Sequence, residues 1–143
     1  GVDRAQMFML RDSDPDSEQK FATSGLTSTK QSGHQPKKAW WYVRAMRHVL
    51  TGTRFDAEVD TQRHDVRGYR VTANGRTVYA GGCPKSKAHE VKDYVAPFVV
   101  PTSATVTELQ SGKPEGATRK LDTPTGAVTL TVTERPVFVT VTK

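Results

Sequence analysis

Four alternating acids near the start of the chain have the clearest potential for chemistry: Asp12, Asp14, Asp16 and Glu18. Such alternation is typical of a calcium loop, where every second residue supplies an oxygen ligand. The EF-hand pattern also requires glycine at its sixth position and glutamate at its twelfth, and this chain has Ser17 and Thr23 there. Pro15 also interrupts the run. The sequence therefore predicts a solvated acidic loop rather than a metal site.

Other side chains suited to catalysis or metal binding are dispersed. The histidines are His34, His48, His64 and His89. Their spacing matches no zinc-binding pattern, and no Ser-His-Asp arrangement is identifiable. Cys83 is the single cysteine, which excludes an internal disulfide, and no base accompanies it in sequence. We expect a buried, unreactive thiol and neither a metal nor a cofactor.

The net charge of +6 over 143 residues raises the question of nucleic-acid binding. The basic residues are interleaved with acids and form no run on one element. None of the usual DNA- or RNA-binding motifs is present. The sequence predicts a solvated surface with a positive bias and no nucleic-acid partner. It also has no apolar run long enough to span a bilayer.

The first elements that would position these residues are a strand, a loop and a helix. Residues 2–10 end in four consecutive apolar residues, which predicts a strand buried on both faces, as in a barrel. Residues 11–35 are polar and predict a long loop, and loops of this length are more often functional than accidental. Residues 36–50 predict a helix with one apolar face. That face consists of Ala39, Tyr42, Val43, Met46, Val49 and Leu50.

Trp40 and Trp41 lie at the start of this predicted helix. A pair of tryptophans suggests a platform on which a sugar ring could stack. Adjacent residues cannot share one helix face, however. We therefore expect core packing, one ring in an interface with the following domain and the other on a neighbouring loop.

Residues 53–143 have an almost entirely β pattern. In residues 54–60 the apolar Phe55, Ala57 and Val59 alternate with acids. Asn74-Gly75 predicts a tight hairpin between two strands. Further strands are predicted at 104–109, 128–133 and 137–142, with one irregular strand at 94–100 and a polar loop at 113–124. The chain is thus predicted to be mainly β, an antiparallel sandwich at 53–143 after a strand–loop–helix unit at 1–52.

Several motifs recur in this order in one enzyme group. They are Gly1-Val2-Asp3-Arg4 leading to Leu10-Arg11-Asp12, Phe21 to Gly25-Leu26, Pro36-Lys37-Lys38-Ala39-Trp40, Val66-Arg67-Gly68-Tyr69, and Val128 to Glu134-Arg135-Pro136-Val137. The chain resembles the carboxyl-terminal portion of a clan A glycoside hydrolase, above all the β-xylosidase-like families. There the last β/α unit of a (β/α)8 barrel precedes an appended β-sandwich. Gly81-Gly82-Cys83 departs from the pattern, because relatives place an aromatic residue there.

The resemblance implies two catalytic glutamates at the ends of the fourth and seventh barrel strands, both upstream of Gly1. The chain alone is therefore expected to be inactive and to hold no catalytic residue. Barrel strands end at the active-site face, so Arg11 and Asp12 become candidate substrate-binding residues. Asp12 would accept hydrogen bonds from sugar hydroxyls and Arg11 would orient a carboxylate. The alternative is a salt bridge that ends the strand.

Two functions remain open. In the first, the chain is the non-catalytic end of a glycosidase, and its sandwich braces the barrel. The expected partners are then a carbohydrate and, through residues 1–52, the rest of the parent chain or another subunit, and the resemblance favours secretion. This function predicts an exposed apolar surface on residues 2–10 and 39–50. In the second, the chain is a free-standing structural, carbohydrate-binding or surface-assembly module.

Overall fold

The computed structural model describes residues 10–13, 22–84 and 89–142. In this part of the chain one helix precedes eight strands. They are α1 (Lys38–Leu50), β1 (Arg54–Val59), β2 (Arg67–Ala73), β3 (Arg76–Gly82), β4 (Val91–Ala96), β5 (Ser103–Glu108), β6 (Ala117–Asp122), β7 (Val128–Val132) and β8 (Val137–Thr142). The strand expected at residues 2–10 lies outside the described residues, except for Leu10. No helix among these residues is long and apolar enough to cross a membrane.

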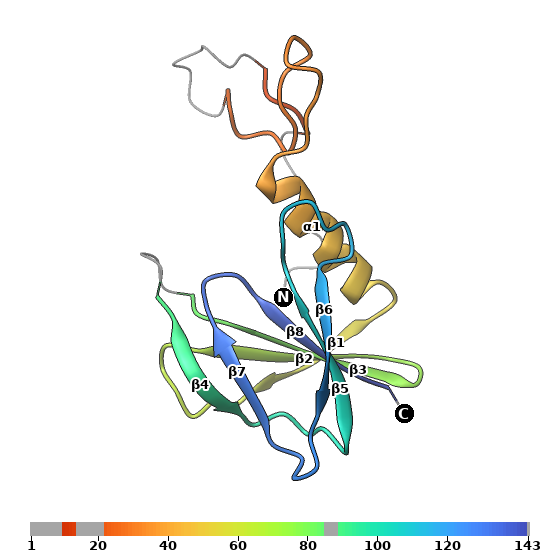
Figure 1. The fold of residues 1–143 in the computed structure, drawn as a ribbon, viewed down its shortest axis with the longest axis vertical. Coiled ribbons are helices and arrows are strands. Elements are labelled where there is room, and N and C mark those ends of the chain that lie inside the picture. The colour runs from red at the N-terminus through yellow and green to blue at the C-terminus, as the bar shows by residue number, and fades with distance from the viewer. Residues whose placement is uncertain (1–9, 14–21, 85–88, 143) are drawn as a thin grey trace.

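The strands form two antiparallel sheets with the main core between them. The larger sheet has the order β1-β2-β3-β8-β5-β6, and β4 pairs with β7 in the smaller one (Figure 1). In β7, valine and leucine side chains point inward and threonines point to solvent, as their alternation predicts. The core includes Tyr79, Val106 and Val139 from the larger sheet and Tyr94, Leu130 and Val132 from the smaller. The predicted antiparallel β-sandwich is therefore confirmed.

The second half of α1 covers the outer face of the larger sheet. Ala45 and Val49 form one buried cluster with Val78 on β3 and Phe138 on β8. Strand β8 is consequently buried on both faces: Val137, Val139 and Val141 point into the sandwich while Phe138 points to the helix. The helix thus forms a third layer, and it continues beyond the sandwich toward the amino-terminal loops (Figure 1).

The Asn74-Gly75 hairpin is confirmed, since Ala73 pairs with Arg76 across a two-residue turn. Gly75 has φ 73°, a left-handed conformation that glycine adopts without steric cost. The irregular strand is β4, whose register shifts between Val91 and Tyr94. Asp93 in this stretch has φ 50°, which accounts for the weak sequence pattern there.

The prediction of a loop over residues 113–124 is wrong. Six of these residues form β6, which pairs with β5 from Ala117↔Glu108 to Asp122↔Ser103. Thr118, Arg119 and Lys120 are all exposed because β6 is the last strand of its sheet. An edge strand can take its order from its neighbour without an alternating apolar pattern.

The predicted faces of β1 and α1 also need correction. A β-bulge between Phe55 and Ala57 places Phe55 opposite Val71, on the helix side of the sheet, away from Ala57 and Val59. Phe55 is 69% exposed. In α1, the sandwich buries Ala45, whereas Ala39 and Met46 of the predicted apolar face are exposed. The helix is therefore apolar on more than one side.

Candidate functional site

The candidate site comprises the amino-terminal arm, defined as residues 10–13 and 22–37, and the face of α1 that the sandwich leaves uncovered. The arm is held by backbone hydrogen bonds. The Asp12 amide donates to the Thr27 carbonyl at 2.9 Å, and the Lys37 amide donates to the Leu26 carbonyl at 2.9 Å. The arm projects away from the sandwich at the far end of α1 (Figure 1).

Asp12 anchors the arm. Its side chain is buried, and its Oδ1 accepts a hydrogen bond from the Gly25 amide at 2.8 Å. Lys37 Nζ lies 3.1 Å from Oδ1 and 3.2 Å from Oδ2, and it also donates to the Thr23 carbonyl at 2.6 Å. The carboxylate therefore links the two ends of the arm. Charge-assisted bonds of this kind are stronger than neutral ones.

Gly25 permits this arrangement. A Cβ atom at this position would lie 2.2 Å from the Arg11 carbonyl carbon and 2.4 Å from the Asp12 nitrogen. Such contacts are impossible with backbone atoms, so only glycine allows the 22–26 turn to lie directly on residues 11 and 12. Both Gly25 and Lys37 belong to the motifs that resemble the glycoside hydrolases, but no local pattern in the sequence indicates that they contact Asp12.

The structure separates the two predicted substrate-binding residues. Asp12 is 8% exposed and engaged with Lys37 and Gly25, whereas Arg11 is exposed and its backbone bridges to Thr27. Asp12 therefore forms an ion pair with Lys37, which lies 25 residues further along the chain. Contact of either residue with a sugar stays a prediction.

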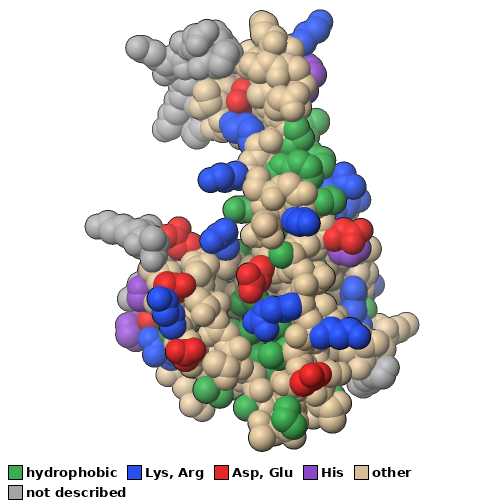
Figure 2. All heavy atoms as spheres, viewed as in Figure 1, with side chains coloured by type: hydrophobic (Ala, Val, Ile, Leu, Met, Phe, Trp, Pro, Cys, Tyr) green, Lys and Arg blue, Asp and Glu red, His purple; other side chains and the backbone are tan. Residues whose placement is uncertain are grey.

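The uncovered face of α1 carries a groove of about 450 Å³. Its walls include Leu26 from the arm and Trp40, Val43, Arg44 and Arg47 from the helix. Figure 2 shows apolar side chains, in green, along the neck that α1 forms, with Lys and Arg side chains on both sides. The groove is therefore lined by both apolar and basic side chains.

The two tryptophans are partly exposed rather than fully packed. Trp40 and Trp41 contact each other edge to face, with ring centres 4.7 Å apart. The Arg44 guanidinium carbon lies 5.1 Å from the centre of a Trp40 ring, a cation–π geometry. The helix contains no Asp or Glu, so its own residues do not neutralise these arginines.

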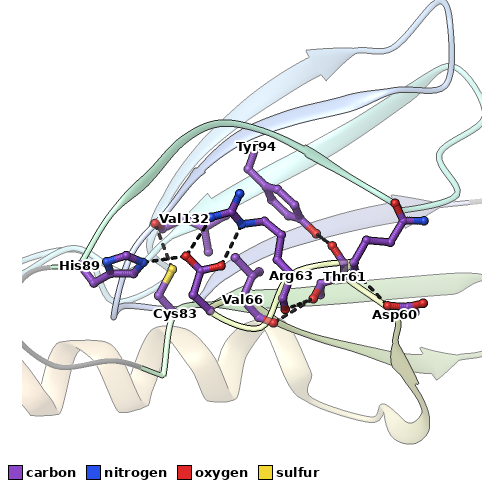
Figure 3. Close-up of polar contacts among 10 residues, drawn as sticks. Asp60, Thr61, Arg63, Val66, Cys83, His89, Tyr94 and Val132 are labelled. Atoms are coloured by element: carbon purple, nitrogen blue, oxygen red, sulfur yellow. Dashed lines mark hydrogen bonds and ion pairs between the residues drawn. The ribbon is translucent and has the colours of Figure 1, made fainter.

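A second polar cluster lies in the sandwich, where the β1–β2 connection meets the segment before β4 (Figure 3). Asp65 is buried and accepts two hydrogen bonds from Arg63, from Nε and Nη2, both at 2.9 Å. His89 Nε2 lies 2.9 Å from Asp65 Oδ2. The bonds from Arg63 and then His89 hold the pKa of Asp65 well below its usual range.

The neighbours of Asp65 tie this cluster to both sheets. The Tyr94 hydroxyl donates to the Thr61 carbonyl at 3.0 Å, and burial raises the pKa of Tyr94. The Cys83 thiol, buried as predicted, donates to the Val132 carbonyl at 3.4 Å. Among the described residues, no three His, Cys, Asp or Glu side chains are grouped to hold a metal ion. The contacts of this cluster join loops and strands and thereby stabilise the sandwich.

No protein family matches the sequence, and no curated protein matches it. The fold is similar to part of a solved structure, a GH30 endoxylanase from Clostridium papyrosolvens C71, with a TM-score of 0.55 and 16% identity. The match covers 83% of this chain and 30% of that chain. At this identity the likeness concerns the fold. The chain therefore shares the architecture of a portion of a clan A glycoside hydrolase.

Proposed function

We propose that this chain is the carboxyl-terminal, non-catalytic part of a glycoside hydrolase, and that its sandwich braces a catalytic barrel. The barrel docks on the amino-terminal arm and the uncovered face of α1. The observation that carries the proposal is the two-sided helix: one side is buried in the sandwich, and another presents an apolar groove. Such a helix is typical of an element packed between two layers.

The fold likeness supports the same arrangement. It covers most of this chain but less than a third of the endoxylanase, so the larger part of an enzyme of that kind has no counterpart here. The barrel would supply both catalytic carboxylates. On this proposal the arm, clamped by Asp12 and Lys37, lies at the carboxyl end of the last barrel strand, on the face where such enzymes act.

The test is a pair of substitutions in two contexts. Val43→Asp puts a charge in the α1 groove, and Thr129→Asp puts one on an exposed position of β7. In the 143-residue chain both should shift the melting temperature by no more than about 2 °C, because both positions meet solvent. In the natural parent polypeptide, Val43→Asp should lower it by roughly 5 °C or more and reduce glycan cleavage, since the charge would be buried.

Thr129→Asp should leave the parent unchanged, and it controls for the charge itself. The parent should contain about 200 or more residues upstream of Gly1, with a glutamate ending each of two barrel strands. An intact mass equal to that of the 143-residue chain would overturn the proposal. Equal tolerance of both substitutions in the parent would also overturn it.

A further inference from the structure

We infer that the outer face of the larger sheet carries a saccharide-binding site beside α1, centred on Tyr69 and bordered by Arg67 and Glu134. These residues line a shallow hollow of about 200 Å³ with Ala80, Gly82 and Pro136. Ala80 also packs against the cluster beneath the helix, which places the hollow next to α1. This inference rests on the proposed function only for the choice of β-linked glycans as the first ligands to test.

The pairing of β2 with β3 brings together the residues that form the floor and one wall of the hollow. Arg67 lies opposite Gly82, and Tyr69 lies opposite Ala80. Directly opposed residues of an antiparallel pair point to the same face, so all four share the outer face. Glu134 and Pro136 come from the connection between β7 and β8 and form the other wall.

Gly82 keeps the hollow empty. A Cβ atom there would meet nothing closer than the Pro136 Cα at 3.7 Å, an ordinary van der Waals distance. The backbone thus has room for a Cβ atom at this position, and that atom would lie on the face that lines the hollow. Glycine weakens a strand interior and often marks a place where a ligand approaches the backbone closely.

The described lining fits a ligand with one apolar face and one polar edge. Tyr69 is 42% exposed, whereas Tyr79 on the neighbouring strand is 4% exposed and stacked on Phe98. A half-exposed ring offers a flat apolar surface against which the C–H face of a pyranose can lie. Among the described lining residues, Arg67 and Glu134 carry opposite charges, and the exposed Arg67 guanidinium can donate hydrogen bonds to hydroxyl groups.

The experiment is a backbone-amide NMR titration of the 143-residue chain with xylohexaose and, separately, cellohexaose. We expect chemical-shift changes centred on residues 67–69 and 80–82. Tyr69→Ala should weaken binding about tenfold, as expected for loss of one aromatic stacking partner. Gly82→Val should weaken it at least as much while leaving the melting temperature unchanged or higher, because a Cβ atom has room at this position and valine favours a strand.

Phe55→Ala is the matched control, since Phe55 is an exposed aromatic on the same face of the sheet but outside the hollow. It should leave the affinity unchanged. Absence of shifts with both oligosaccharides at millimolar concentration would overturn the inference, as would binding that survives Gly82→Val. Neither result bears on the bracing role, which is tested by Val43→Asp in the parent.

Discussion

Two buried aspartates, Asp12 in the arm and Asp65 in the sandwich, have similar partners but different surroundings. Each carboxylate pairs with a cation, Lys37 in one case and Arg63 in the other. Each also has one further partner, the Gly25 amide or the His89 ring. The polar partners of Asp12 all belong to the arm, whereas Asp65 lies beside side chains of the main core.

This difference shows how stability is distributed along the chain. A polar clamp inside a packed core contributes to cooperative unfolding of the whole unit, while a clamp in a projecting segment controls only local opening. The arm is ordered by its own hydrogen bonds, and it joins the sandwich through α1. A segment of this kind can orient a second domain that docks against it, which agrees with the docking role proposed for the arm and the α1 groove.

The largest effect should come from the layer that joins the helix to the sandwich. Phe138 is 1% exposed and packs beneath α1, so Phe138→Ala should lower the free energy of unfolding by about 3–5 kcal/mol. Urea unfolding followed by circular dichroism measures this change. Phe55→Ala, at a 69% exposed position, should cost less than about 0.5 kcal/mol. Similar losses in the two variants would mean that the helix layer is not part of the cooperative unit.

Asp65→Asn should give the next largest effect. It removes the charge that Arg63 and His89 share while keeping the size of the side chain. We expect the melting temperature to fall by on the order of 5 °C, because the buried position of Asp65 loses the charge that pairs with the Arg63 guanidinium. Asp56→Asn breaks the exposed ion pair with Arg70 and should change the melting temperature little. An unchanged melting temperature for Asp65→Asn would remove the distinction between the two aspartates.

The pH dependence of the sandwich should also follow Asp65. Its folded-state pKa is depressed, so its contribution is fully present above the unfolded value of about 3.9 and is lost as pH falls toward the folded value. The stability difference between the native chain and Asp65→Asn should therefore be present at pH 5 and shrink below about pH 4. Urea midpoints across this range measure it. A difference that widens in acid would contradict the assignment.

Periodic elements were accessible from the sequence, because their signals are local. The α1 helix, the Asn74-Gly75 hairpin and the alternation in β7 and β8 all follow from neighbouring residues. Strand β6 was missed because its order comes from β5. The position of Phe55 was wrong because a bulge reverses faces without a sequence signature.

The contacts of the candidate site could not be predicted, for a different reason. Asp12 and Lys37 are 25 residues apart, and Asp65 and His89 are 24 apart. Their meeting depends on the path of the chain through loops, for which no periodic pattern exists. An exposed apolar surface on residues 39–50 was expected, and Met46 and the groove lined by Val43 provide one. The sequence did not show which side of the helix the sandwich buries, because that depends on contacts with distant strands.

The smallest expected effect concerns the arm alone. Asp12→Asn should leave the global melting temperature within about 2 °C of the native value, because the carboxylate's contacts within the described part of the chain all lie in the arm. Amide exchange at Gly25, which donates to Asp12, should become at least about tenfold faster, since a hydrogen bond to a charged acceptor is weakened. Hydrogen exchange measured by NMR separates this local opening from global unfolding.

Asp65→Asn should give the reverse pattern. Core amides such as Cys83, whose N–H is bonded to the Thr133 carbonyl, should exchange faster, and Gly25 should change little. If Asp12→Asn accelerated exchange equally in the arm and the core, the two clamps would belong to one cooperative unit, and the arm would be an integral part of the sandwich rather than a separate docking element.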